Sequence, residues 1–267
     1  MIGYDILSSV KEMTSYLPSP SGEARYFRGK ELKELTDPQA KFLAGIFEVA
    51  GGISMRISDV KRVTSKGSWY EAETVDSLVQ YSDNDEAKIE ALKEMFGGDY
   101  KKHPTEQSWK WHVGGRVADN LLQQIKPYSP LRRYQIELHN RVYATRDIEE
   151  RKCLVAAFNE YNRTPHSFPD VEEYKELARD PDFLRGVFAG RGADYSFEQD
   201  SPLRFWTQNI SLLSAIGEPY GLEPYPIVNA RIPRHEGARI PVSFRLEMNN
   251  GPKTDFLAKI GATDIAA

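Results

Sequence analysis

The sequence has 267 residues, of which 40% are hydrophobic and 28% are charged. This ordinary globular balance excludes wholesale disorder and a collagen-like repeat. A disulfide scaffold is also excluded, because Cys153 is the only cysteine. Lysine and arginine number 35 against 39 acidic residues, so the net charge is −4, which counts against a protein that coats nucleic acid but allows a local basic face. With no apparent secretory signal or bilayer-length apolar run, we expect an intracellular protein of the cytoplasm or an organellar matrix, with no membrane contact.

The first half of the chain predicts alternating helices and strands. Residues 1–36 read as an N-terminal extension, and a helical pattern then runs from Gln39 to the paired glycines at 51–52. Apolar and polar residues alternate from Ile53 to Ser58, which is typical of a half-buried strand. Further segments are expected as a strand at 69–81, a helix at 82–98, a strand at 108–113, and helices at 116–126 and 130–163.

The second half predicts the same order again. A short helical run at 183–190 is followed by strands at 193–198 and 204–207, a helix near 212–216, strands at 227–232 and 240–248, and a helix near 254–260. This succession indicates an internal duplication with a period near half the chain. We therefore expect a first repeat at 37–145, and linker helices with a second repeat at 146–267.

Two nine-residue segments share one pattern, LAGIFEVAG at residues 43–51 and LRGVFAGRG at residues 184–192. They resemble the two motif copies of the single-chain LAGLIDADG homing endonucleases. The segments SDND at 82–85, PYSPLRRYQ at 127–135 and FLAKIG at 256–261 are also similar to that family. The resemblance covers roughly residues 39–261 and leaves the N-terminal extension unexplained.

The resemblance implies an α+β fold of two αββαββα repeats related by a pseudo-twofold axis, in a monomer. The two motif helices pack together at that axis, and we expect Gly45 and Gly186 at their contact because a missing Cβ lets backbones approach closely. The resemblance also implies that the antiparallel sheets form a saddle over the DNA major groove, which admits a two-stranded ribbon.

In active family members an acidic residue at the eighth motif position holds divalent metal at the scissile phosphates. Here that position is Ala50 in the first copy and Arg191 in the second. Glu48 and Asp194 are conceivable remnants, although Glu48 lies about 200° round the helix from position eight. The family's basic position near the cleavage site is Arg132, which binds phosphate but transfers protons poorly. We expect cleavage to be lost and no cofactor, with Mg²⁺ needed only if residual nuclease activity exists.

Basic residues on the expected strands and loops are candidates for nucleic-acid contact. Residues 101–112 and 226–247 each carry a surplus of two positive charges, whereas residues 192–206 are acidic. The candidate set is Arg56, Lys61, Arg62, Lys66, Lys101, Lys102, Lys110, Arg132, Arg231, Arg234, Arg239 and Arg245. An equally simple interpretation is that these side chains form only a solvated strand face.

Three functions remain open from the sequence. The first is a nucleic-acid-binding protein derived from a homing endonuclease, which binds duplex DNA without cleaving it. The second is an RNA-binding intron maturase or a structural subunit of a ribonucleoprotein, and DNA is favoured over RNA. The third is an active endonuclease whose carboxylates have been relocated.

Overall fold

The computed structural model describes residues 25–27, 30–32, 34–63, 67–163, 167–191, 202–227 and 243–262. Two short antiparallel strands, β1 (Arg25–Phe27) and β2 (Lys30–Leu32), lie within the N-terminal extension. No helix among the described residues has the length and apolar composition needed to cross a membrane.

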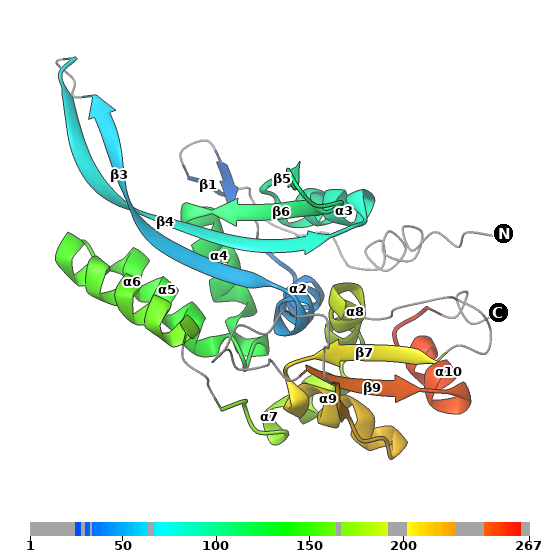
Figure 1. The fold of residues 1–267 in the computed structure, drawn as a ribbon. Coiled ribbons are helices and arrows are strands. Elements are labelled where there is room, and N and C mark those ends of the chain that lie inside the picture. The colour runs from blue at the N-terminus through cyan, green and yellow to red at the C-terminus, as the bar shows by residue number, and fades with distance from the viewer. Residues whose placement is uncertain are drawn as a thin grey trace.

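The first repeat forms a four-stranded antiparallel sheet with the strand order β3-β4-β6-β5. Its elements are α2 (Asp37–Val49), β3 (Gly52–Val63), β4 (Trp69–Asp83), α3 (Glu86–Phe96), β5 (Asp99–Lys102), β6 (Trp109–Gly114) and α4 (Gly115–Ile125). The strands β3 and β4 pair along their length, whereas β4 pairs with β6 only over Leu78–Asp83, so the outer part of the β3–β4 hairpin projects beyond the sheet (Figure 1).

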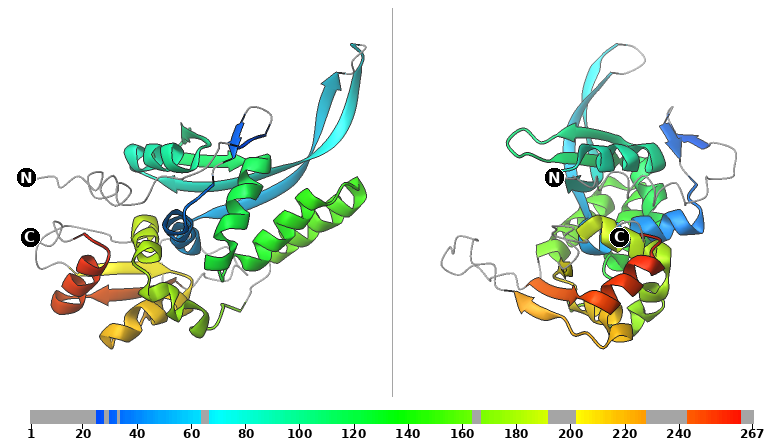
Figure 2. Two further views of the ribbon diagram at one scale, coloured as in Figure 1. Left: turned by 180° about the vertical axis from the view of Figure 1, so that it is seen from behind. Right: turned by 90° about the vertical axis from the view of Figure 1, so that its right-hand side faces the viewer.

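Two long helices, α5 (Arg133–Ala144) and α6 (Ile148–Arg163), form most of the connection between the repeats. Three short helical segments complete it: η1 (Lys126–Tyr128), α7 (Glu172–Lys175) and η2 (Leu177–Arg179). The helices α5 and α6 pack on each other, and α6 also contacts β3 (Figure 2). The expected division at residue 145 falls in the turn between these two packed helices.

The second repeat has the same order wherever it is described. Its elements are α8 (Pro181–Arg191), β7 (Leu203–Thr207), α9 (Ile210–Gly217), η3 (Glu218–Tyr220), β8 (Tyr225–Ile227), β9 (Ser243–Met248) and α10 (Asn250–Lys259). Its antiparallel sheet has the order β7-β9-β8, which matches β4-β6-β5 of the first repeat. The expected α+β class with antiparallel sheets is confirmed, and the strand expected at 193–198 lies outside the described residues.

The helices α2 and α8 pack directly against each other in the middle of the molecule (Figure 1). A Cβ atom added to Gly45 would lie 2.3 Å from the Phe183 carbonyl oxygen. A Cβ atom on Gly186 would lie 1.9 Å from the Phe42 carbonyl oxygen. These positions leave no room for a side chain, so glycine sets the closeness of the two helices.

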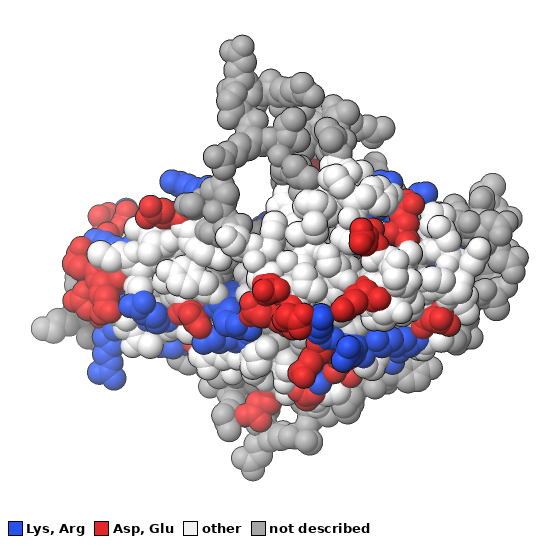
Figure 3. Space-filling model, turned by 90° about the horizontal axis from the view of Figure 1, so that it is seen from below, with Lys and Arg blue, Asp and Glu red and all other residues white. Residues whose placement is uncertain are grey.

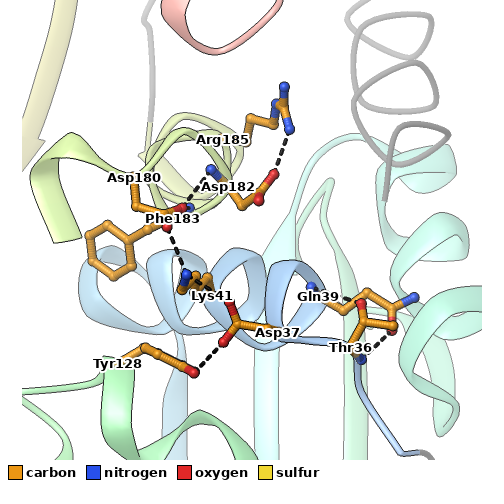
Figure 4. A network of polar contacts seen from close by, with 9 residues as sticks. All are labelled: Thr36, Asp37, Gln39, Lys41, Tyr128, Asp180, Asp182, Phe183 and Arg185. Atoms are coloured by element: carbon orange, nitrogen blue, oxygen red, sulfur yellow. Dashed lines mark hydrogen bonds and ion pairs between the residues drawn. The ribbon is translucent and has the colours of Figure 1, made fainter. Parts of the chain in front are cut away.

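Polar contacts join the N-terminal ends of the same two helices (Figure 4). Thr36 caps α2 in a capping box with Gln39. The Asp180 carboxylate accepts hydrogen bonds from the backbone N–H groups of Asp182 and Phe183 at the start of α8. Lys41 Nζ lies 2.8 Å from this carboxylate and 2.7 Å from Asp37, so one cation links both helix starts.

The structure differs from the expected elements in three details. The helix α3 begins at Glu86 rather than at residue 82, and it is capped by Asp85, whose carboxylate accepts from the Ala87 and Lys88 N–H groups. The strand β5 was not expected, because its sequence DYKK carries no apolar alternation. The helical pattern at 130–163 is two helices, with a break at residues 145–147.

Candidate nucleic-acid interface

Each face of the first sheet has a distinct environment. Along β3, Ile53, Met55 and Ile57 point toward the helices, and their register partners on β4 share that side. The ion pair between Glu73 on this side and Lys152 on α6, with 2.5 Å between Nζ and Oε2, identifies the helix-covered face. Because strand residues alternate, the even-numbered residues of β3 lie on the opposite, open face.

Three of the candidate basic residues lie on this open face. Arg56 lies on β3, where its guanidinium is 3.4 Å from Asp76 in a largely exposed pair. Lys110 on β6 is directly paired with Lys101 on β5. The alternation therefore brings Arg56, Lys101 and Lys110 to one side of one sheet.

Two other candidate residues lie on the wrong side for this surface. Lys61 has the same strand parity as Ile57, and Lys102 sits over the Trp109 ring, with 5.7 Å between Nζ and the ring centroid. Both side chains are exposed, but they point to the side that the helices cover. The candidate set from the sequence therefore does not form a single surface.

Several candidate residues cannot be placed. Lys66, Asp194, Arg231, Arg234 and Arg239 lie outside the described residues, and the side chains of Arg62 and Arg191 are not described. The basic stretch at 226–247 is thus represented mainly by Arg245 on β9.

The open face of the second sheet carries mixed charges and two aromatic rings. The inner face holds buried Leu203, Phe205 and Leu246. On the open face, Arg204 and Arg245 both approach Glu247 Oε1, at 2.8 and 3.5 Å. Trp206 and Tyr225 lie on the same side and are each 40% exposed.

Charges on the underside of the molecule show no single sign. Acidic and basic side chains alternate there along a central band (Figure 3). The described part of this underside offers no broad basic area to a polyanion.

The C-terminal ends of α2 and α8 are where the resemblance places metal ligands. Ala50 caps α2, and its side chain offers no oxygen. Arg191 is the last residue of α8. A Cβ atom on Gly190 would lie 2.6 Å from Val49 Cγ2, so the two helix ends are close neighbours.

Glu48 is turned into the protein rather than toward this surface. It is 1% exposed, and its Oε2 accepts a hydrogen bond from the Tyr174 hydroxyl. The same oxygen lies 3.3 Å from the Leu131 N–H and 3.4 Å from Asn209 Nδ2. Its Oε1 is buried and has no hydrogen-bond partner within the part of the chain that the structure describes.

Burial raises the pKa of Glu48 to about 7, against the opposing influence of Tyr174 and Arg132. Asn209 also donates to the Tyr174 hydroxyl at 2.8 Å and caps α9 through its Oδ1. The carboxyl group therefore joins the first motif helix to the linker and to the second repeat. This is a structural role inside the protein.

Arg132, to which the resemblance gives a phosphate-binding position, is held by hydrogen bonds within the protein. Its guanidinium donates to the Phe47 carbonyl oxygen at 3.2 Å, to the Gly51 carbonyl oxygen at 2.8 Å and to Gln135 Oε1 at 3.2 Å. These bonds hold the guanidinium against the end of α2. The sequence pattern gave no sign of them, because Phe47 and Gly51 offer only backbone oxygens.

Asp83 is the described carboxylate that lies near the end of α8. Tyr81 donates to it at 2.6 Å, and the Tyr81 hydroxyl also lies 3.2 Å from the Ala189 carbonyl oxygen. Burial alone would raise the pKa of Asp83, but Lys88, with its Nζ 2.6 Å away, holds that pKa below its usual value. The negative charge of Asp83 is therefore already balanced by the ammonium group of Lys88.

The residues at the helix ends do not fit the metal that the resemblance implies. A hard divalent ion requires oxygen ligands. Ala50 supplies none, Glu48 is bound internally, and Asp83 is paired with Lys88. Among the described residues, no three His, Cys, Asp or Glu side chains are grouped so that they could hold a metal.

The two paired helices and the two saddle-shaped sheets are the fold of the LAGLIDADG homing endonucleases. A variant of I-SmaMI superposes with a TM-score of 0.54 at 16% identity over 83% of both chains. I-GzeII, described as a LAGLIDADG homing endonuclease in complex with its DNA target, gives 0.50 at 10% identity over 85% of this chain and 87% of its own. Meganuclease I-SmaMI bound to uncleaveable DNA gives 0.50 at 16% identity, with 84% and 85% covered. No family model and no curated protein matches the sequence.

Sequence reasoning missed Tyr174, Asn209 and Trp206. Tyr174 and Asn209 are 126 and 161 residues from Glu48, and no local pattern connects them. The sequence could have assigned the basic residues of β3 to the two faces of the sheet, because the apolar residues at 53, 55 and 57 share parity with Lys61 and not with Arg56.

Proposed function

We propose that this protein binds duplex DNA through the open face of its first sheet and does not cleave it. The observation that carries the proposal is the placement of Arg56, Lys101 and Lys110 on the side of the sheet that none of the described helices covers. Lysine and arginine on such a face neutralise phosphates and release counterions.

The fold supports duplex DNA as the ligand. I-SmaMI and I-GzeII, which share this fold, are described bound to DNA. A two-stranded ribbon fits the major groove, and the projecting β3–β4 hairpin is such a ribbon. We infer that the chain derives from such an endonuclease and acts as a monomer.

The inference that cleavage is lost is based on the residues at the C-terminal ends of α2 and α8. Ala50 and Arg191 occupy the eighth motif positions, so neither copy supplies the carboxylate that would hold metal. The inward orientation of Glu48 argues against its use as a relocated ligand in the first copy. We infer that the motif is degenerate as a metal site.

A second candidate is an RNA-binding maturase or a structural ribonucleoprotein subunit. The net charge of −4 favours it, because such a protein relies on shape and protein contacts more than on phosphate attraction.

A salt titration of DNA binding tests the proposal. The double variant Arg56→Gln/Lys110→Gln should bind a mixed-sequence duplex more weakly, and the log–log slope against salt should fall by about 0.9 for each lost phosphate contact. Lys61→Gln is the matched control, because Lys61 lies on the same strand but on the opposite face.

Two results would contradict the proposal. One is the absence of duplex binding by the wild type. The other is an equal effect of Lys61→Gln and Arg56→Gln, which would mean that the open face is not the contact surface. The same titration with an RNA duplex decides between the two candidates.

A further inference from the structure

One row of side chains crosses all three described strands of the second sheet. Trp206 on β7 is the register partner of Arg245 on β9, and Arg245 is the register partner of Tyr225 on β8. Directly paired residues share a face, so the three side chains stand side by side on the open face. The two rings are separated by two strand spacings, about 10 Å.

The same row can be located in the first repeat from the helices that follow it. Trp206 lies three residues before the N-cap Asn209, and Ser82 lies three residues before the N-cap Asp85. Arg245 and Lys110 each lie five residues before the helix after their strand. The counterpart row is therefore Ser82, Lys110 and Lys101, which are paired across β4, β6 and β5.

The two rows differ in chemistry although they occupy equivalent positions. The first row has two ammonium groups and no ring. The second row has an arginine between two aromatic residues, and Glu247 beside it offsets part of the positive charge. The first row suits phosphates, which are dense along a duplex, whereas the second row offers flat apolar surface.

From this difference we infer that the row Trp206–Arg245–Tyr225 binds unpaired nucleotides, which stack on the two rings while Arg245 contacts the intervening backbone. A base within a duplex already has both faces stacked, so exposed rings on a sheet are suited to bases that are single-stranded. The inference deepens the proposed function, because it assumes a nucleic-acid ligand. It assigns the duplex to the first sheet and an adjoining single-stranded segment to the second.

Fluorescence anisotropy with labelled oligonucleotides about 16 nucleotides long, as single-stranded DNA, single-stranded RNA and duplex DNA, tests this inference. The variant Trp206→Ser/Tyr225→Lys gives the second row the chemistry of the first. Its affinity for single strands should fall by roughly 5- to 100-fold, the loss expected for removal of base stacking, while its duplex affinity should not fall.

Two further variants separate stacking from folding. Trp206→Phe keeps a ring and should retain most of the single-strand affinity. Trp69→Ser removes a tryptophan of the first sheet that is 69% exposed and lies on the face opposite the open face. This change should leave the single-strand affinity unchanged. Whichever single strand the wild type binds more tightly, DNA or RNA, identifies the source of the unpaired bases.

The outcomes are distinguishable. If the wild type binds duplex but no single strand, or if the double variant keeps its single-strand affinity, the inference is wrong and the proposed function stands. If the double variant loses duplex and single-strand affinity by the same factor, the row belongs to the duplex surface and the inference is also wrong. If the wild type binds none of the three ligands, both fail.

Discussion

Gly186 shows how a single missing Cβ atom determines the packing of the two repeats. We expect Gly186→Ala to destabilise the protein by about 3 kcal/mol or more, because the added atom would overlap the Phe42 carbonyl oxygen and two backbones would have to move. The matched control is Gly251→Ala in α10, where an added Cβ meets nothing within 4 Å. That change should be neutral or stabilising by about 0.5 kcal/mol. Urea denaturation measures both, and equal effects would show that α2 and α8 do not meet at Gly186.

Glu48 gives the stability of the protein a distinctive dependence on pH. Its folded pKa of about 7 lies above the ordinary value of 4.5, so the folded state holds the proton more tightly than the unfolded state. The contribution of this group is therefore favourable at low pH and is lost as the pH rises from about 4.5 to about 7. The loss is on the order of 3 kcal/mol.

Glu48→Gln removes this titration while it keeps the shape of the side chain. Relative to the wild type, the variant should become more stable as the pH rises through this window, as measured by urea denaturation at several pH values. Glu94→Gln, which replaces an exposed glutamate on α3 in the same way, is the control. A constant difference for Glu48→Gln would mean that folding does not raise the pKa of this carboxyl group.

The contacts of some residues could be predicted from the sequence, and those of others could not. The contact at Gly45 and Gly186 could be proposed because few residues other than glycine permit such an approach. Apart from Gln135, the partners of Glu48 and Arg132 could not be predicted, because they are fixed by tertiary packing across 81 to 161 residues. Chemistry at a position is readable from its side chain, but the direction in which that side chain points depends on the rest of the fold.

Elements with strong periodicity were predictable, and short polar ones were not. The helix α2 and the strand β3 follow their apolar patterns closely. The strand β5 has no such pattern and is held by pairing with β6. Its position in the sheet, and with it the pairing of Lys101 with Lys110, depends on strand order rather than on local sequence.

The start of α8 combines two stabilising contacts that substitutions can separate. Asp180→Ala removes both the cap of α8 and the ion pair with Lys41, and it should cost about 1–2 kcal/mol. Asp180→Ser restores a capping oxygen but not the charge, so it should recover most of that loss. Urea denaturation at low and high salt measures the two parts, because only the ion pair is screened. Equal losses for the two variants would exclude a contribution from the cap.

At the scale of the whole molecule, the duplication was readable from the succession of elements, but the difference between its halves was not. Both sheets have the same strand order where they are described. Their open faces nevertheless carry different side chains, because a fold constrains the inner face of a strand more than the outer one. Function can therefore diverge between the halves while the paired helices keep them in the same relation.

Cleavage requires both halves at once, and this makes it the sharpest test of the whole molecule. In the mechanism that the resemblance implies, two metal-bound carboxylates, one from each motif copy, would stabilise the attacking and leaving oxygens. With Ala50 and Arg191 at those positions, we expect no double-strand cleavage of a mixed plasmid library in Mg²⁺ or Mn²⁺. Conversely, Ala50→Asp/Arg191→Asp should create a site for Mn²⁺, detectable as a loss of free-ion signal in electron paramagnetic resonance, whereas Ala50→Asp alone should bind it more weakly. Site-specific cleavage by the wild type that Glu48→Gln or Asp194→Asn abolishes would show that the carboxylates were relocated rather than lost.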